Sequence, residues 1–303
     1  MSYRIHPDSG LTDEVRRIAG REIHRATSLL VDPDIDRHFA VHKARRAIKR
    51  LRALLSLVGA ADRRKIDRSY QRLGEVGRTL SAIRDAAAMV EVFDRLREGI
   101  SDGMEPAAFD GFRFALVTRR DRIVGAQVDA DALVSGAVDG LRREMRTIER
   151  FKAKPGTRWA GRILGNGIAR SRRRARAALA AAQAHPDPEA FHALRKRINA
   201  NLFHLRLLRE IHPERIGPLA KAASDLGTRL GHHHDICVLI ALIDGEPSLW
   251  EGVGEPTAMR AALVGELGVL EKDILLRAGE VLAIGPGRLR RIVERRYAGL
   301  AED

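Results

Sequence analysis

Basic side chains gather along one stretch of helical length, His42–Arg52, whose sequence is HKARRAIKRLR. At about 100° per residue, its apolar residues fall on one face and its basic residues on the other. No Asp or Glu occurs between residues 37 and 61, although like charges three or four residues apart cost about 0.2–0.5 kcal/mol per pair. Guanidinium groups bind phosphate oxygens bidentately, and Lys adds a point charge. The stretch therefore predicts a surface that binds a polyanion, and the alternative is a basic face that meets only solvent.

A weaker copy of this stretch, HALRKRI, begins at His192, 150 residues after His42. At this constant offset Arg45 aligns with Arg195, and no gap is needed as far as the Glu-Pro pairs at 105–106 and 255–256. We interpret the pattern as two copies of one helical unit, packed about a pseudo-two-fold axis. Such packing would bring the two basic helices to face a shared space.

A third basic stretch, residues 150–176, contains ten Lys or Arg residues and no acid. The bases of Arg170–Arg176 are spread around a helix, so we expect about half of these to contact a ligand. We assign a ligand role to Arg172, Arg173 and Arg176.

The histidines allow two kinds of chemistry. His42 and His192 hold equivalent positions in the two copies, where each is either a ligand contact or a structural residue. Within a phosphate-lined site an imidazole would be drawn toward its charged form. The run from His232 to Asp235 suggests a metal site, because imidazole and carboxylate groups are common ligands. However, the equivalent of His234 is Arg84, which cannot bind a metal, so a basic residue followed by Asp better suits a pair that joins helices or orients a ligand.

Composition limits the fold class and the partners. The chain of 303 residues has a net charge of +14, 45% hydrophobic residues and only 4% aromatic ones. Its abundance of Ala, Leu and Arg favours helices, and the charge indicates acidic partners. The single Cys237 excludes a disulfide within the chain and suits a reducing compartment. We see neither an apolar leader nor an apolar run of about 20 residues, so we expect a cytoplasmic protein with no membrane partner.

Helical periodicity and helix-breaking residues predict an all-α chain without strands. We expect one or two helices in residues 63–97, interrupted near Gly74 and Gly77, and a turn at 101–106. Residues 1–10 read as a loose start. The other helices are expected at 13–30, 36–58, 107–126, 130–152, 163–183, 188–211, 218–244, 257–279 and 287–301.

Enzyme motifs are absent from the sequence. There is no Walker A loop, no nucleophile elbow and no dinucleotide-binding glycine fingerprint. Nor is there a homeodomain, zinc-finger or basic-zipper pattern, and the scarcity of aromatic residues argues against platforms for base stacking.

These basic segments resemble the CHAD domain, the conserved histidine α-helical domain. His42–Arg52 and the following Leu80-x-x-x-Arg84-Asp85 are similar to its first half. Three further segments are similar to its second half: Arg172-Arg173-x-x-Arg176-Ala177, His192-x-Leu194-Arg195-Lys196-Arg197 and Leu230-Gly231-x-x-His234-Asp235-x-x-Val238-Leu239. The resemblance covers nearly the whole chain.

This resemblance implies two similar helical bundles around a basic cavity or pore. The family binds inorganic polyphosphate and is associated with polyphosphate granules. Some members are fused to a triphosphatase-type CYTH domain, for which this chain has neither the room nor the Glu-x-Glu-x-Lys pattern. The implied role is therefore binding without catalysis and without a cofactor.

The second copy departs from the family pattern at residues 199–202, where Asn199, Ala200, Asn201 and Leu202 replace Lys, Arg, Leu and Arg. Arg206 and Arg209 partly compensate, so we expect the second half to hold its ligand less tightly than the first. Ala87 stands where the family usually has a second Asp.

We therefore expect one domain over residues 8–303, made of repeats at about 8–153 and 157–303, that binds polyphosphate. Two rival functions are nucleic-acid binding, which is less favoured, and a metal-dependent phosphohydrolase that uses the run from His232 to Asp235. The expected polyphosphate-binding residues are His42, Arg45, Arg46, Lys49, Arg50, Arg52, Arg84, Arg172, Arg173, Arg176, His192, Arg195, Lys196, Arg206 and His234.

Overall fold

Helices form all the regular structure of the described residues. The computed structural model describes residues 3–100, 106–126, 130–254 and 256–299, and within these ranges it contains no strand. Side chains at 82–88, 97–100, 106–108 and 124–126 are outside the description. The elements in chain order are α1 (Leu11–Val31), α2 (Arg37–Leu57), α3 (Arg63–Ile100), α4 (Pro106–Ala126), α5 (Ala130–Glu149), α6 (Thr157–Ala184), α7 (Pro188–Leu207), the 3₁₀ helix η1 (Arg209–Ile211), α8 (Pro213–Gly245), the 3₁₀ helix η2 (Pro247–Trp250), α9 (Pro256–Val281) and α10 (Pro286–Gly299).

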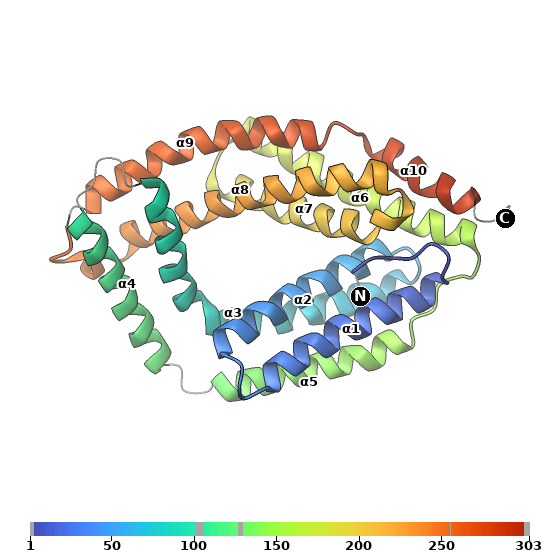
Figure 1. The fold of residues 1–303 in the computed structure, drawn as a ribbon, viewed down its shortest axis with the longest axis horizontal. Helices are drawn as coiled ribbons and strands as arrows, with labels where there is room; N and C mark the ends of the chain where they lie inside the picture. The colour runs from blue at the N-terminus through green and yellow to red at the C-terminus, as the bar shows by residue number, and fades with distance from the viewer. Residues whose placement is uncertain (1–2, 101–105, 127–129, 255, 300–303) are drawn as a thin grey trace.

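The helices form two sets that follow the order of the chain (Figure 1). In the first set, α2 packs between α1 and α3, and α5 packs against α1 and α3. In the second set, α7 packs between α6 and α8, while α9 lies on α8 and α10 on α6. The long helices α3 and α8 begin 150 residues apart, as do α4 and α9. This spacing agrees with the offset found in the sequence, and the pseudo-two-fold axis stays a prediction.

The two basic helices begin at caps that their sequences encode. Asp36 accepts a hydrogen bond from the Phe39 N–H at 2.8 Å, and Asp187 accepts one from the Ala190 N–H at 2.7 Å. Such caps satisfy N–H groups that have no partner within the helix. Pro188 follows its cap at the first helical position, where the missing N–H of proline costs nothing.

Several predicted helix boundaries are wrong. The helix α3 continues through Gly74 and Gly77, and Gly74 lies closely against the Arg52 guanidinium. The helix α8 begins at Pro213 rather than at Pro218, which lies inside its second turn and so removes only one helical hydrogen bond. The helix α6 begins at residue 157 rather than at 163. The predicted turn at 101–106 lies mostly outside the described residues.

Small residues and one buried histidine join the two sets of helices. A Cβ on Gly167 of α6 would lie 2.0 Å from the Leu57 carbonyl oxygen at the end of α2, so only glycine permits this approach. His204 of α7 is buried, and its Nε2 lies 2.9 Å from the Ala53 carbonyl oxygen and 2.8 Å from Ser56 Oγ, both in α2. Because the carbonyl can only accept, the proton of the neutral ring is on Nε2.

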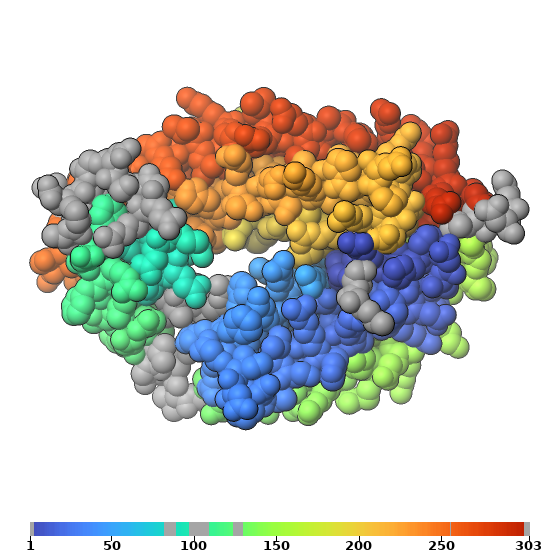
Figure 2. Space-filling model, in the orientation of Figure 1, coloured from blue at the N-terminus to red at the C-terminus, as the bar shows by residue number. Residues whose placement is uncertain are grey.

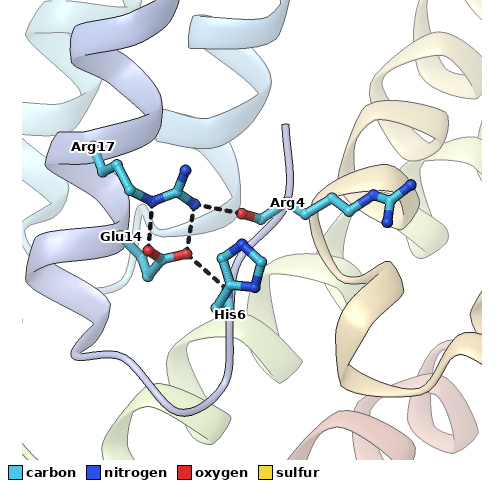
Figure 3. A network of polar contacts seen from close by, with 4 residues as sticks. All are labelled: Arg4, His6, Glu14 and Arg17. Atoms are coloured by element: carbon cyan, nitrogen blue, oxygen red, sulfur yellow. Dashed lines mark hydrogen bonds and ion pairs between the residues drawn. The ribbon is translucent and has the colours of Figure 1, made fainter. Parts of the chain in front are cut away.

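The segment before α1 is fixed in place, in contrast to the loose start that we predicted. The Arg17 guanidinium donates two hydrogen bonds to the Glu14 carboxylate, at 2.6 and 2.7 Å, and a third to the Arg4 carbonyl oxygen (Figure 3). The His6 N–H donates to the same carboxylate at 2.7 Å. On the other side, the Ile5 N–H donates to the Leu207 carbonyl oxygen at 2.8 Å. Residues 3–6, which we call the N-terminal strap, thus connect α1 to the end of α7.

Candidate functional site

Four predicted ligand residues lie together where α7 meets α8. His192 of α7 stacks on His234 of α8, with ring centroids 4.8 Å apart. Arg195 and Lys196 follow His192 by three and four residues, so all three lie on one side of α7. The charges of Arg195 and Lys196 act on both imidazoles. We call His192, Arg195, Lys196 and His234 the α7–α8 cluster.

The basic surroundings hold the two imidazoles neutral. Burial, followed by the charges of Arg195 and its neighbours, lowers the pKa of His234 to about 4. Burial and the charges of Lys196 and Arg195 also lower the pKa of His192. Positive neighbours disfavour a further positive charge until an anion offsets them. The prediction that a phosphate-lined site draws an imidazole toward its charged form concerns the bound ligand, and it stays a prediction.

The charge of Asp235 acts on Arg195 of the α7–α8 cluster. A side chain from the first set of helices binds this carboxylate. Arg95 of α3 donates to Asp235 Oδ2 at 2.9 Å. Burial lowers the pKa of Arg195 and the charge of Asp235 opposes this change. The basic residue followed by Asp thus contributes to a junction between helices, which is one of the two roles that its recurrence suggested.

The basic face of α2 divides into residues that face different neighbours. Arg52 lies over the ring of Tyr70 in α3, 4.1 Å from its centroid. Lys49 is exposed, whereas His42 and Arg45 are half-buried and each makes contacts. The half-buried pair lies one turn apart on the helix, with Lys49 one turn further on.

Arg46, Arg50 and Arg206 form a second basic group, and Arg50 contacts Tyr3 of the N-terminal strap. Arg50 pairs with the buried Glu22 at 3.2 Å, and its guanidinium lies 5.3 Å from the centroid of the Tyr3 ring. The Tyr3 hydroxyl donates to the Arg50 carbonyl oxygen at 2.7 Å. Burial lowers the pKa of Arg206, as do the charges of Arg46 and Arg50. Tyr3 had no signal in the sequence, because its role depends on a contact between segments far apart in the chain.

Arg172 is a core residue, which corrects its assignment to the ligand site. It is fully buried, and it donates to Asn201 Oδ1 at 3.0 Å and to the Ile284 carbonyl oxygen at 3.2 Å. Burial and the charge of Arg176 lower its pKa to about 10. A guanidinium enclosed in this way cannot contact a polyphosphate chain that binds at the surface. Asn201, one of the departures from the family pattern, is thus the partner that holds Arg172 in the core.

Two further predicted residues belong to another helix, α6. Arg173 and Arg176 are exposed on α6, and Arg176 donates to the Leu282 carbonyl oxygen at 3.5 Å. The Arg84 side chain lies outside the described residues. The sequence therefore predicted one compact set of ligand residues, whereas the structure distributes them over several surfaces.

The three adjacent histidines of α8 point to different partners. His232 pairs with Glu266 of α9, and His233 bonds to Glu271 of α9 at 3.1 Å while stacking on Phe191. His234 stacks on His192. Across the described ranges no group of three His, Cys, Asp or Glu residues is placed to hold a metal ion. Cys237 lies 3.6 Å from His233 Nδ1, but burial raises the pKa of its thiol to about 11, which leaves it unreactive at neutral pH.

An opening separates the first set of helices from the second on one face of the molecule (Figure 2). It lies between α2 below and the α7 and α8 helices above in this view. The α7–α8 cluster and the basic face of α2 belong to the helices on its two sides. No helix of the described chain is long and apolar enough to cross a membrane.

Comparison with known proteins identifies the family. The family model of the CHAD domain matches residues 22–244. No curated protein matches the chain in sequence. The crystal structure of the CHAD domain from the plant Ricinus communis is similar, with 15% identity, coverage of 94% of this chain and 95% of that one, and a TM-score of 0.57. At this identity the likeness concerns the fold alone. From the match over residues 22–244, the chain belongs to the CHAD domain family.

Proposed function

We propose that this protein binds inorganic polyphosphate, without altering it, through basic side chains of α2, α7 and α8. The observation that carries the proposal is the α7–α8 cluster. It places two neutral imidazoles and two cations together, and Arg95 already engages Asp235, the carboxylate whose charge acts on Arg195. An anionic chain would supply the missing negative charge and would turn the imidazoles into further donors.

Phosphate chemistry fits this surface better than nucleic acid does. Among the described residues, large exposed aromatic side chains occur at Phe39, Phe114 and Trp159. Only Phe39 belongs to a helix of the proposed site, α2, and the Lys43 ammonium already lies over its ring, 4.7 Å from the centroid. Recognition of single strands usually relies on such rings for base stacking. Polyphosphate has no bases, so charge and chain shape are all that the site must recognise.

The proposed site combines the α7–α8 cluster with His42, Arg45 and Lys49 of α2. Arg172 is excluded because it is buried. Arg50 is secondary, because Glu22 already neutralises it. We also propose that the protein is cytoplasmic and located at polyphosphate granules, as the family assignment suggests.

The first experiment measures the binding of long-chain polyphosphate at about 50 and 200 mM salt, with duplex DNA and RNA of matched phosphate content as competitors. We expect binding to weaken steeply with salt, because neutralising several phosphates releases counterions. Preference for polyphosphate supports the proposal. Equal or stronger binding of either nucleic acid overturns it.

A matched pair of variants tests where the site lies. Arg45→Glu with Arg195→Glu reverses one charge on each side of the opening. Arg63→Glu with Arg277→Glu makes the same change in net charge at exposed residues that pair with Asp67 and Asp273. We expect the first variant to bind at least roughly tenfold more weakly than the second, since charged hydrogen bonds contribute about 1.5–3 kcal/mol each. Equal affinities would show that the site lies elsewhere.

A further inference from the structure

Five arginines converge on a second, separate concavity. A pocket of about 740 Å³ lies between the beginning of α8 and the helix α10. Its volume falls in the range of ligand pockets, roughly 300–1,000 Å³. Its arginines are Arg215, Arg288, Arg291, Arg295 and Arg296. None of them belongs to the polyphosphate site proposed above.

These arginines lack acidic partners. Among the described residues, none of the five is in an ion pair, and no acidic side chain lines the pocket. On the same helix, Arg290 pairs with Glu294 at 3.4 Å, so α10 does form ion pairs outside the pocket. Convergence of like charges disfavours the folded state unless a counter-charge is present. The pocket therefore has the electrostatics of an anion site.

The N-terminus of α8 adds to the positive potential of the pocket. His212 lines the pocket and occupies the N-cap position of α8, where no side chain caps the helix. The N-terminus of a helix carries a partial positive charge and N–H groups without helical partners. This charge and the guanidinium groups favour the same kind of ligand.

The lining residues indicate the class of anion. Guanidinium forks match the oxygen pairs of phosphate groups, and several forks around one volume suit several linked phosphates. The lining contains a single apolar residue, Ile292, and no aromatic ring other than His212. A nucleoside base would therefore find little to stack on.

We propose that this pocket is a second anion site, which binds a short chain of linked phosphates. It is distinct from the α7–α8 cluster, because Arg215 and His234 are 19 residues apart on α8, or about 28 Å along the helix axis. The proposal does not depend on long-chain binding at that cluster.

Calorimetric titration with inorganic tripolyphosphate, at about 0.15 M salt, tests the proposal. The pocket variant carries Arg291→Gln and Arg295→Gln, both at exposed positions. The control carries Arg63→Gln and Arg277→Gln, which remove the same charge from exposed residues that pair with nearby Asp side chains. We expect the pocket variant to bind tripolyphosphate at least roughly tenfold more weakly than the control. Circular dichroism verifies that both variants are folded.

Two comparisons separate this site from the proposed polyphosphate site. The variant with Arg45→Glu and Arg195→Glu should bind tripolyphosphate as tightly as the variant with Arg63→Glu and Arg277→Glu, which has the same net charge. The pocket variant should retain long-chain affinity within about twofold of its control. Equal tripolyphosphate affinity in the pocket variant and its control would overturn the proposal, as would a failure of the wild-type protein to bind tripolyphosphate. Neither result would bear on whether the protein binds long-chain polyphosphate.

Discussion

The imidazole rings of His192 and His234 stack with their centroids 4.8 Å apart and their planes 28° from parallel. One ring comes from α7 and the other from α8, so the contact joins the two helices at the proposed site. Burial, followed by the charges of Lys196 and Arg195, lowers the pKa of His192; burial, followed by the charges of Arg195 and His192, lowers the pKa of His234. We expect this pair to link ligand binding to pH.

Polyphosphate affinity should increase as the pH falls from about 7.5 to 5.5. Without ligand, burial and the charges of Arg195, Lys196 and the adjacent histidines keep His234 neutral. A bound anion raises the pKa of both imidazoles, so protons are taken up on binding. Affinity then rises by up to about tenfold per pH unit for each proton taken up. Dissociation constants at the two pH values provide the measurement, and calorimetry in buffers of different ionisation enthalpy counts the protons.

The double variant with His192→Gln and His234→Gln is the control for this effect. It keeps polar side chains of similar size but has no group that titrates in this range. Its affinity should depend on pH less than that of the wild type. Equal pH dependence in the two proteins would contradict the role of this histidine pair.

Acidification should destabilise the fold through His204. Burial lowers the pKa of this histidine to about 4, because its protonated ring would carry an Nδ1–H without an acceptor and would face the charges of Arg170 and Arg174. The unfolded pKa is about 6.5, so the folded state is penalised as the pH falls below that value. Between pH 7 and pH 5 the free energy of unfolding should fall by about 2 kcal/mol from this residue alone.

Urea unfolding at both pH values, compared with His204→Gln, isolates this contribution. Glutamine retains an N–H donor for the Ala53 carbonyl oxygen but cannot be protonated. The variant should therefore lose less stability on acidification than the wild type. Equal losses would show that His204 is not the responsible group.

Substitution of Gly167 by Ala should destabilise the contact between the two sets of helices. The new Cβ would lie 2.0 Å from the Leu57 carbonyl oxygen, and backbone cannot move aside as a side chain can. We expect a loss of at least about 3 kcal/mol, at the upper end for overpacking. Gly265→Ala in α9 is the control, because its Cβ would meet nothing within 4 Å, and it should gain up to about 1 kcal/mol. Thermal unfolding of both variants measures the difference, and similar stabilities would contradict the close approach.

Glu14→Gln should weaken the attachment of the N-terminal strap. Burial alone would raise the pKa of Glu14, but hydrogen bonds from Arg17 and the His6 N–H outweigh it, so the pKa lies below its usual value. The ionised Glu14 carboxylate therefore stabilises the fold at neutral pH, and this stabilisation is lost as the pH falls through the pKa of Glu14 in the folded state. At pH 7 we expect a loss of about 1–3 kcal/mol in urea unfolding. The exposed neighbour Asp13→Asn should cost less, and equal costs would argue against a special role for Glu14.

Local patterns in the sequence were sufficient to predict the helices that carry the site. The apolar spacing of residues 41–55 places Val41 and Leu51 in the core, where both are fully buried. Asp36 and Pro188 are local signals as well, because a cap depends only on the residues beside it. The fold class and the family were predictable for the same reason.

Long-range contacts explain what the sequence could not predict. Arg172 was assigned to the ligand site by its basic neighbours, but its burial depends on Asn201 and on a carbonyl oxygen 112 residues away. The lowered pKa of His234 follows from contact with α7. The sequence did not predict the arginine pocket, because its lining residues come from two segments, 212–215 and 288–296, that are far apart in the chain.

The N-terminal strap also constrains the order in which the protein can mature during synthesis. Residues 3–6 are made about 200 residues before Leu207 and Glu210, the groups that bond to Ile5 and Arg4. At translation rates of about 5–20 residues per second, the strap waits roughly 10–40 s for these partners. A nascent chain can therefore form the contacts of the strap with α1 and α2 early, but the groups of Tyr3 and Ile5 that contact α7 stay without these partners until α7 has been made. The contacts of the strap are thus completed only on a chain that has been made as far as η1.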